Sequence, residues 1–396
     1  MRIPTANTSI GQEEIEAVMK LLKENVVTPG SKVREFEDGI TRVFGKKHGV
    51  MVNSGSSANL LALYAHKKPG LEVITPALTF GTTVAPILQA GMKPKFFDSE
   101  ADTYVIDVDA VEEYVESTPN VERIFMIPAL VGNLPDLTRL RDLSRKHGSL
   151  FILDSCDTNG ALFDGKPIGT YADIATSSFY STHIITAGGG GGVIMTDDDE
   201  LKSKLQVLRG WGRASAGTLE SEDINVRFNY SIDGIPYDSK LAFKECGFNM
   251  QVTEMQGTIA VEQLKKLPEF MRIRKATFKK IFDFFKTKPY FITPKQHPKT
   301  DTLFINFPLT LTPDCPFTRQ ELVVFLENHD VQTRALFSGN ITRHPGFRDL
   351  VGGPIPFKNA DYIMKNSLLI GCHQGLTDAH LEYLFSVFDL FLKEKV

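Results

Sequence analysis

The chain has 396 residues, enough for two or three domains and a large buried core. Its apolar content of 42%, charged content of 23% and net charge of −4 are ordinary for a soluble protein, and they give no electrostatic reason to expect nucleic acid or an anionic membrane as a partner. No apolar segment is long enough to span a bilayer, and residues 1–7 lack the apolar core of a signal peptide, so we expect a cytoplasmic location.

Over the first 250 residues, short apolar runs alternate with amphipathic segments. This alternation predicts an α/β fold with a large, mostly parallel sheet. The predicted strands are 49–53, 72–75, 95–98, 123–127 and 149–154. The helices predicted between them cover 58–65, 84–88 and 137–147.

Residues 214–240 are polar and poor in apolar periodicity, which predicts a long loop or hairpin. In a compact enzyme such a loop is more often functional than idle. A long helix is predicted for 253–285, and Pro268 inside it predicts a kink or break.

From about Pro289 the alternation of apolar and amphipathic segments returns. The predicted strands there are 302–307 and 331–336, and the predicted helices are 318–328 and 377–391. We therefore expect residues 1–250 to form a large domain with an N-terminal arm, and residues 251–396 to form a connecting helix and a small C-terminal α/β domain.

The four cysteines lie far apart and form no C-x-x-C pair. Metal, iron–sulfur and disulfide frameworks need closer or more regular spacing, so free thiols and no metal site are expected. The cysteines are Cys156, Cys246, Cys315 and Cys372.

Two strand ends in the first half carry residues suited to a ligand. The run Asn53–Asn59 links a strand to a helix, and its small residues and exposed amides can hold a phosphate, although an ordinary capped helix has the same pattern. Asp154 ends the apolar run Phe151–Leu153. At the carboxyl edge of a parallel sheet it could face a pyridine nitrogen, or it could cap a helix. Phe80 could stack on a flat ring or belong to the core.

His183 lies in a turn that follows a buried strand. The strand and turn run from Ser177 to His183, five glycines occupy 188–192, and a second strand follows at 193–196. No lysine occurs between Lys166 and Lys202. A histidine in such a turn can move a proton near neutral pH, or it can be a satisfied core residue.

Taken in this order, the motifs resemble the pyridoxal phosphate (PLP) enzymes of fold type I in the DegT/StrS-type sugar aminotransferase family. The resemblance covers nearly the whole chain and includes Thr28-Pro29-Gly30 and the segment from Cys246 to Gln256. It implies an aspartate aminotransferase-like fold and a homodimer with a shared active site. It also implies Gly55, Ser56 and Ser178 on the cofactor phosphate, Phe80 over the ring, Asp154 on the ring nitrogen, and Asn249 reaching the phosphate bound by the neighbouring subunit.

The sequence departs from the aminotransferases of this family at two positions. His183 stands where they carry the lysine that forms the Schiff base, and Asp157 stands where they usually carry glutamine or histidine. Both exchanges resemble the 3-dehydratase branch, which acts on GDP-4-keto-6-deoxy-D-mannose in the colitose pathway or on a CDP-linked relative. The CDP-sugar enzymes carry clustered cysteines for an iron–sulfur centre, which this chain lacks, so no iron–sulfur reductase is expected as a partner.

The resemblance implies that PLP binds non-covalently and is converted to pyridoxamine phosphate (PMP) by an amino donor, for which we expect glutamate. The substrate would be a nucleotide-linked 4-keto-6-deoxyhexose, which loses its 3-hydroxyl group with His183 as acid and base. The product would serve dideoxysugar biosynthesis, as in colitose and O-antigen lipopolysaccharide. Arg334 and Arg343 could grip the nucleotide diphosphate, or they could be surface charges.

Three alternatives stay open from the sequence alone. The chain could be a nucleotide-sugar aminotransferase that has lost its lysine, a CDP-sugar 3-dehydratase, or a catalytically idle protein that binds PLP or a nucleotide sugar. The nucleotide base, the configuration of the hexose and the amino donor are not determined by these motifs.

Overall fold

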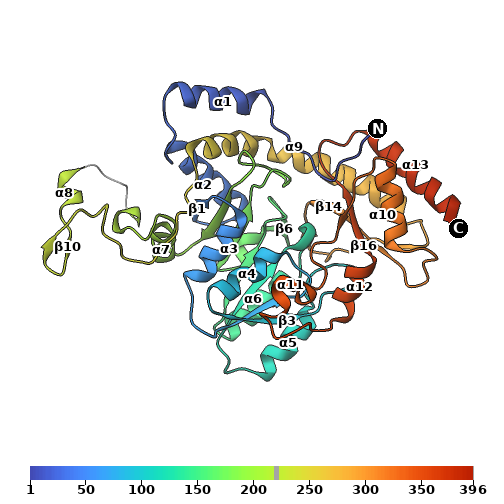
Figure 1. Ribbon diagram of the computed structural model, residues 1–396, viewed down its shortest axis with the longest axis horizontal. Helices are drawn as coiled ribbons and strands as arrows, with labels where there is room; N and C mark the ends of the chain where they lie inside the picture. The colour runs from blue at the N-terminus through green and yellow to red at the C-terminus, as the bar shows by residue number, and fades with distance from the viewer. Residues whose placement is uncertain (218–222, 396) are drawn as a thin grey trace.

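The computed structural model describes residues 1–217 and 223–395, and a seven-stranded sheet forms its centre (Figure 1). Strand β9 is antiparallel to both of its neighbours, and the remaining strands are parallel to one another. The predicted α/β fold with a mostly parallel sheet is confirmed. The strand order is β1 (His48–Val52), β9 (Gly192–Thr196), β8 (Ile174–Ser178), β5 (Leu150–Asp154), β4 (Arg123–Pro128), β2 (Glu72–Pro76) and β3 (Lys93–Phe97).

Apolar side chains cover both faces of this sheet. Strand β4 is buried along its whole length, and its residues alternate between two clusters: Phe125 and Ile127 face one, Ile124 and Met126 the other. A parallel strand buried on both faces is expected to be a continuous apolar run, as this one is. The helices in the same part of the chain as these strands are, in chain order, α2 (Ser31–Phe44), α3 (Gly55–Tyr64), α4 (Gly81–Gln89), α5 (Val108–Ser117), α6 (Leu137–Lys146) and α7 (Asp199–Arg209).

The long helix α9 (Glu254–Phe285) begins at a capping box formed by Thr253 and Gln256. It continues through Pro268 as one helix, so the predicted break is wrong, and the predicted kink stays a prediction. Leu267 and Phe270 on either side of the proline are buried. Their packing offsets the one backbone hydrogen bond that a proline removes.

The C-terminal part is built on a four-stranded antiparallel sheet and a phenylalanine-rich core. The strand predicted at 302–307 begins later, at Asn306. The reason is that the carbonyls of Phe304 and Ile305 accept hydrogen bonds from the buried Arg274, and the Ile305 amide donates to Val131. The elements are β12 (Phe291–Ile292), β14 (Asn306–Leu311), α10 (Arg319–Asn328), β15 (Arg334–Ala335), α12 (Lys358–Asn366), β16 (Ser367–Gly371) and α13 (Asp378–Lys395).

Smaller elements complete the part of the chain that the structure describes. Helix α1 (Gln12–Lys23) lies beside α9 on the surface (Figure 1). The short elements are η1 (Leu130–Gly132), β6 (Leu162–Phe163), β7 (Lys166–Pro167), η2 (Ile168–Tyr171), β13 (Thr300–Asp301), η4 (Ile341–Arg343) and α11 (Pro345–Arg348).

None of the helices within 1–217 and 223–395 is long and apolar enough to cross a membrane.

Residues 211–217 and 223–247 belong to an arm that projects away from the sheet (Figure 1). The described part of the predicted 214–240 loop contains the β10–β11 hairpin, so the hairpin prediction is confirmed; residues 218–222 lie outside the described residues. Its elements are η3 (Ala214–Gly217), α8 (Ile224–Arg227), β10 (Ser231–Ile232) and β11 (Ile235–Pro236). Large apolar side chains exposed on the described part of the arm include Ile224, Phe228, Ile235, Leu241 and Phe243.

Candidate active site

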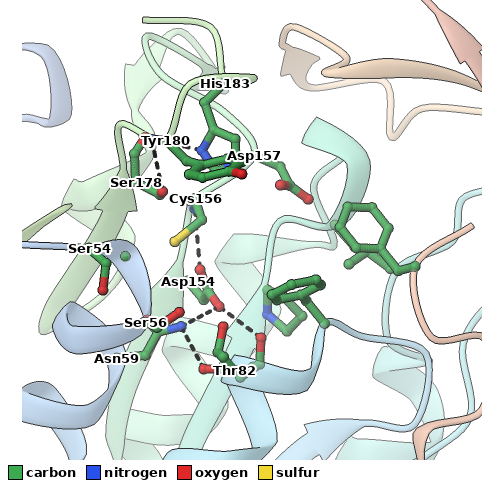
Figure 2. A pocket seen from close by; sticks show the side chains of 16 residues that line it. Ser54, Ser56, Asn59, Thr82, Asp154, Cys156, Asp157, Ser178, Tyr180 and His183 are labelled. Atoms are coloured by element: carbon green, nitrogen blue, oxygen red, sulfur yellow. Dashed lines mark hydrogen bonds between the residues drawn. The ribbon is translucent and has the colours of Figure 1, made fainter. Parts of the chain in front are cut away.

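A cavity of about 290 Å³ opens at the carboxyl edge of the large sheet (Figure 2). Because the parallel strands β1, β2, β4, β5 and β8 all end at this edge, residues far apart in the sequence meet there. One residue, Phe337, comes from the C-terminal part. The lining consists of Ser54, Gly55, Ser56, Asn59, Phe80, Thr82, Thr83, Pro128, Leu130, Phe337, Asp154, Cys156, Asp157, Ser178, Tyr180 and His183.

The first turn of helix α3 forms one wall of the cavity. The Ser54 side chain caps the helix by accepting a 3.1 Å hydrogen bond from the Ser57 amide. The Gly55 and Ser56 amides belong to the first turn, where a helix provides no acceptor for them. A Cβ atom on Gly55 would lie 2.5 Å from the Ser178 Cβ and 2.9 Å from the Cys156 Sγ. This close approach requires glycine and leaves a cradle suited to a phosphate group.

Asp154 lies at the floor of the cavity and is 6% exposed. Its Oδ2 atom accepts hydrogen bonds from Asn59 Nδ2 at 2.8 Å and Thr83 Oγ1 at 2.9 Å (Figure 2). Its Oδ1 atom accepts from the Cys156 amide at 3.2 Å. No helix begins after Asp154, so the capping role considered from the sequence does not apply. Three donors hold this carboxylate in one orientation.

Asp157 is also almost fully buried, and its Oδ2 atom accepts a 2.9 Å hydrogen bond from the Val131 amide. Burial, together with the nearby charge of Asp154, raises the pKa of Asp157 to about 7. The side chain can therefore gain or lose a proton near neutral pH.

His183 lies at the opposite end of the cavity from Ser56 (Figure 2). Its Nδ1 atom is 3.2 Å from the carbonyl oxygen of Ser178. A carbonyl only accepts, so Nδ1 carries the hydrogen in the neutral ring and Nε2 keeps its lone pair. Burial lowers the pKa of His183 to about 4, so at neutral pH the imidazole is uncharged and able to take a proton on Nε2.

The aromatic side chains stand at the mouth of the cavity. Phe80 is 54% exposed, so it does not belong to the core, and its ring packs edge-to-face on Phe337 with centroids 6.1 Å apart. Tyr180 is equally exposed and lies edge-to-face with the His183 ring, also at 6.1 Å.

Several lining residues were not identified from the sequence. Asn59 follows Gly55 by one helical turn and Thr83 follows Phe80 by three residues. This helical spacing could have placed both residues on the same side of their helices as the predicted site residues. Cys156 lies between the two aspartates. Nothing in the sequence near Phe337 indicates that it reaches this edge of the sheet.

Three predicted residues lie outside the cavity lining. Asn249 is exposed and forms an isolated bridge with Gly210. Arg334 is exposed on β15. Arg343 pairs with Asp361, with Nε–Oδ1 and Nη2–Oδ2 distances of 2.5 Å and 2.6 Å. Their assigned roles stay predictions, and the described lining contains no lysine or arginine.

The sequence profile described as the DegT/DnrJ/EryC1/StrS aminotransferase family matches residues 8–388. The chain belongs to this family. The lipopolysaccharide biosynthesis protein RfbH of Salmonella typhimurium is 35% identical, over 98% of this chain and 91% of that protein. GDP-4-keto-6-deoxy-D-mannose 3-dehydratase of Yersinia pseudotuberculosis is 32% identical, over 98% of both chains.

Solved structures of similar enzymes have the same fold. The E. coli GDP-4-keto-6-deoxy-D-mannose 3-dehydratase with bound hydrated PLP superimposes with a TM-score of 0.86 at 27% identity, covering 98% of this chain and 99% of that one. A Campylobacter jejuni transaminase of an amino sugar is also similar, 27% identical over 97% of both chains. This chain is thus a PLP-dependent enzyme of a sugar-modifying family.

The residues of the cavity fit this cofactor. The cradle at Gly55 and Ser56 has the shape and the free amides that suit an anion, and the buried Asp154 carboxylate can face a protonated ring nitrogen. Phe80 offers a ring face at the mouth. His183 is the residue that distinguishes the site, because an imidazole cannot form the Schiff base that a lysine forms.

Proposed function

We propose that this enzyme is a PLP- and PMP-dependent 3-dehydratase that removes the 3-hydroxyl group of a nucleotide-linked 4-keto-6-deoxyhexose. The observation that carries the proposal is His183, a neutral imidazole that lines the cofactor cavity where no lysine is present among the described lining residues. Without a lysine, the cofactor cannot be held as a lysine Schiff base, from which amine exchange usually starts.

Bound PLP supplies an electron sink and carries an amino group between the donor and the sugar. The buried Asp154 would keep the ring nitrogen protonated, which maintains that sink. His183 would take a proton on Nε2 and give it to the departing 3-hydroxyl group, since one imidazole can act first as base and then as acid. Asp157, whose pKa lies near 7, could exchange protons close by.

The overall reaction balances without an external reductant. Glutamate, the proposed amino donor, is oxidised to 2-oxoglutarate and ammonia and gives up two electrons. The sugar takes up these two electrons as its C3–O bond breaks, and a 3,6-dideoxy-4-keto sugar results. No iron–sulfur reductase is needed as a partner in this scheme.

GDP-4-keto-6-deoxy-D-mannose is the first substrate to test. Its support is the similarity to the Yersinia pseudotuberculosis enzyme over 98% of the chain. The lining of the cavity has two aspartates and no described cation, so charges for the substrate diphosphate must come from elsewhere. Arg334 and Arg343 are candidates, although Arg343 would first have to leave Asp361.

A second copy of the chain is the other source of groups for the site. We propose a homodimer in which the projecting arm covers a neighbouring subunit and Asn249 reaches the cofactor phosphate of that subunit. The exposed apolar side chains of the arm, such as Ile224 and Phe243, support a contact surface there.

Product analysis tests the proposed function. The purified enzyme is incubated with PLP, glutamate and a panel of GDP-, CDP- and dTDP-linked 4-keto-6-deoxyhexoses, and products are read by mass. We expect one substrate to yield a sugar that has lost one oxygen atom. An amino sugar would instead establish a transaminase, and binding without turnover across the panel would establish an idle binding protein.

A further inference from the structure

The N-terminal segment Ile3–Gly11 connects the C-terminal sheet to the turn that carries His183. At its start, the Ile3 amide donates to the Asp330 carbonyl at 2.8 Å. The Thr5 carbonyl then accepts a 2.6 Å hydrogen bond from Asn306 Nδ2 at the beginning of β14. The segment is therefore anchored on the C-terminal part before it reaches the active site.

Thr8 holds one end of the His183 turn. Its Oγ1 atom donates a 2.7 Å hydrogen bond to the carbonyl oxygen of Ser181, two residues before His183. This carbonyl has no partner in a helix or strand, because Ser181 lies in a turn. This solvent-exposed hydrogen bond satisfies a backbone acceptor of the turn.

Ser9 and Gln263 hold the other end. Gln263 Nε2 donates to the Ser9 carbonyl at 2.8 Å, and Gln263 Oε1 accepts from the Thr186 amide at 3.3 Å. Gln263 is 1% exposed, so water does not compete for these bonds. Ser181 and Thr186 enclose His183, and both are tied to the same N-terminal segment.

We propose that the N-terminal segment, together with Gln263 of α9, is a clamp that positions the His183 imidazole, and that Thr8 and Gln263 are the positioning residues. The catalytic role of this clamp rests on the proposed function. A proton-transferring group must be held to within about 0.5 Å of its productive place. The His183 turn is followed by five glycines, 188–192, which provide little stiffness of their own.

Amide hydrogen exchange read by mass spectrometry on the holoenzyme tests the clamp. In Thr8→Val, which keeps the shape and loses the donor, the peptide covering 179–190 should exchange about two- to ten-fold faster, as expected for one lost hydrogen bond. Thr8→Ser keeps the hydroxyl and should restore the wild-type rate. Thr287→Val removes a comparable hydroxyl–carbonyl bond at the end of α9 and serves as the matched control.

Activity provides the second readout. Thr8→Val should lower kcat for deoxygenation and leave the PLP affinity and KM unchanged, and Thr8→Ser should recover kcat. An unchanged exchange rate at 179–190 in Thr8→Val overturns the clamp. If no substrate of the panel is deoxygenated, the proposed function fails, yet the exchange experiment still decides whether the clamp exists.

Discussion

A neutral imidazole and an aspartate that titrates near neutral pH lie in the same cavity. Burial lowers the pKa of His183 to about 4 and raises that of Asp157 to about 7, because a cavity of low polarity disfavours the charged form of either group. At neutral pH His183 is therefore a base and Asp157 is partly protonated. Two groups whose pKa values are moved in opposite directions suit alternating proton transfers.

The substitution His183→Asn tests the imidazole directly. An amide can keep the hydrogen bond to the Ser178 carbonyl but cannot take up a proton, so turnover should fall by about 10²–10⁴-fold. PLP affinity, followed by absorbance titration, should hardly change, since the cradle and Asp154 remain. Turnover close to that of the wild type in a correctly folded variant would rule out His183 as the proton carrier.

At the scale of secondary-structure elements, the sequence was most informative where local pattern and tertiary contact agree. The buried strand that leads to Asp154 was predictable because an apolar run ended by a polar residue is typical of a parallel sheet. The start of β14 was not predictable from the sequence. Arg274 donates hydrogen bonds to the backbone carbonyls of the two preceding residues, so these carbonyls are not paired in the strand. The inclusion of Phe337 in the site depends on contacts between distant segments, which no local pattern records.

The junction of β1 and α3 provides a prediction at this scale. Gly55→Ala would place a methyl group 2.5 Å from the Ser178 Cβ and force the cradle open. We expect PLP affinity to fall about ten-fold or more, because overpacking a rigid site costs of the order of 1–3 kcal/mol.

Gly346→Ala is the control for this change, because its new Cβ would meet no atom within 4 Å. It should leave the affinity unchanged. Equal PLP affinity in Gly55→Ala and the wild type, measured by the same absorbance titration, would show that the first turn of α3 does not hold the phosphate.

For the molecule as a whole, Asp157 makes the stability depend on pH. Its folded-state pKa, about 7, lies above its usual value of 3.8, so the protonated carboxyl favours folding. This contribution is fully present below pH 3.8 and is lost as the pH rises through 7. In Asp157→Asn the side chain is an amide that does not titrate, so this pH-dependent contribution to stability is absent.

The free energy of unfolding of Asp157→Asn, relative to the wild type, should therefore rise by up to about 1.4 kcal/mol per pH unit between pH 4 and 7. Urea denaturation at several pH values measures the difference, and it should level off above pH 7. A difference that stays constant with pH would mean that Asp157 titrates normally in the folded protein.

The proposed dimer predicts complementation between two inactive variants. An Asn249→Ala chain and a His183→Asn chain, each inactive alone, form a heterodimer in which one site keeps both intact residues. Up to half of the wild-type activity per dimer should return when the chains are co-expressed with different tags and purified as a pair. Purified heterodimers without activity would contradict a shared site, as would a fully active monomer in sedimentation.

The fate of the donor nitrogen distinguishes deoxygenation of the sugar from transfer of an amino group to it. The enzyme is supplied with PLP, heavy-nitrogen glutamate and the substrate found in the panel, and the label is followed by mass spectrometry. A 3-dehydratase should release free labelled ammonia in equal amount to a sugar that has lost its 3-oxygen and contains no label. A sugar that carries the labelled nitrogen and keeps all its other oxygens would contradict the proposed deoxygenation and make the enzyme a transaminase.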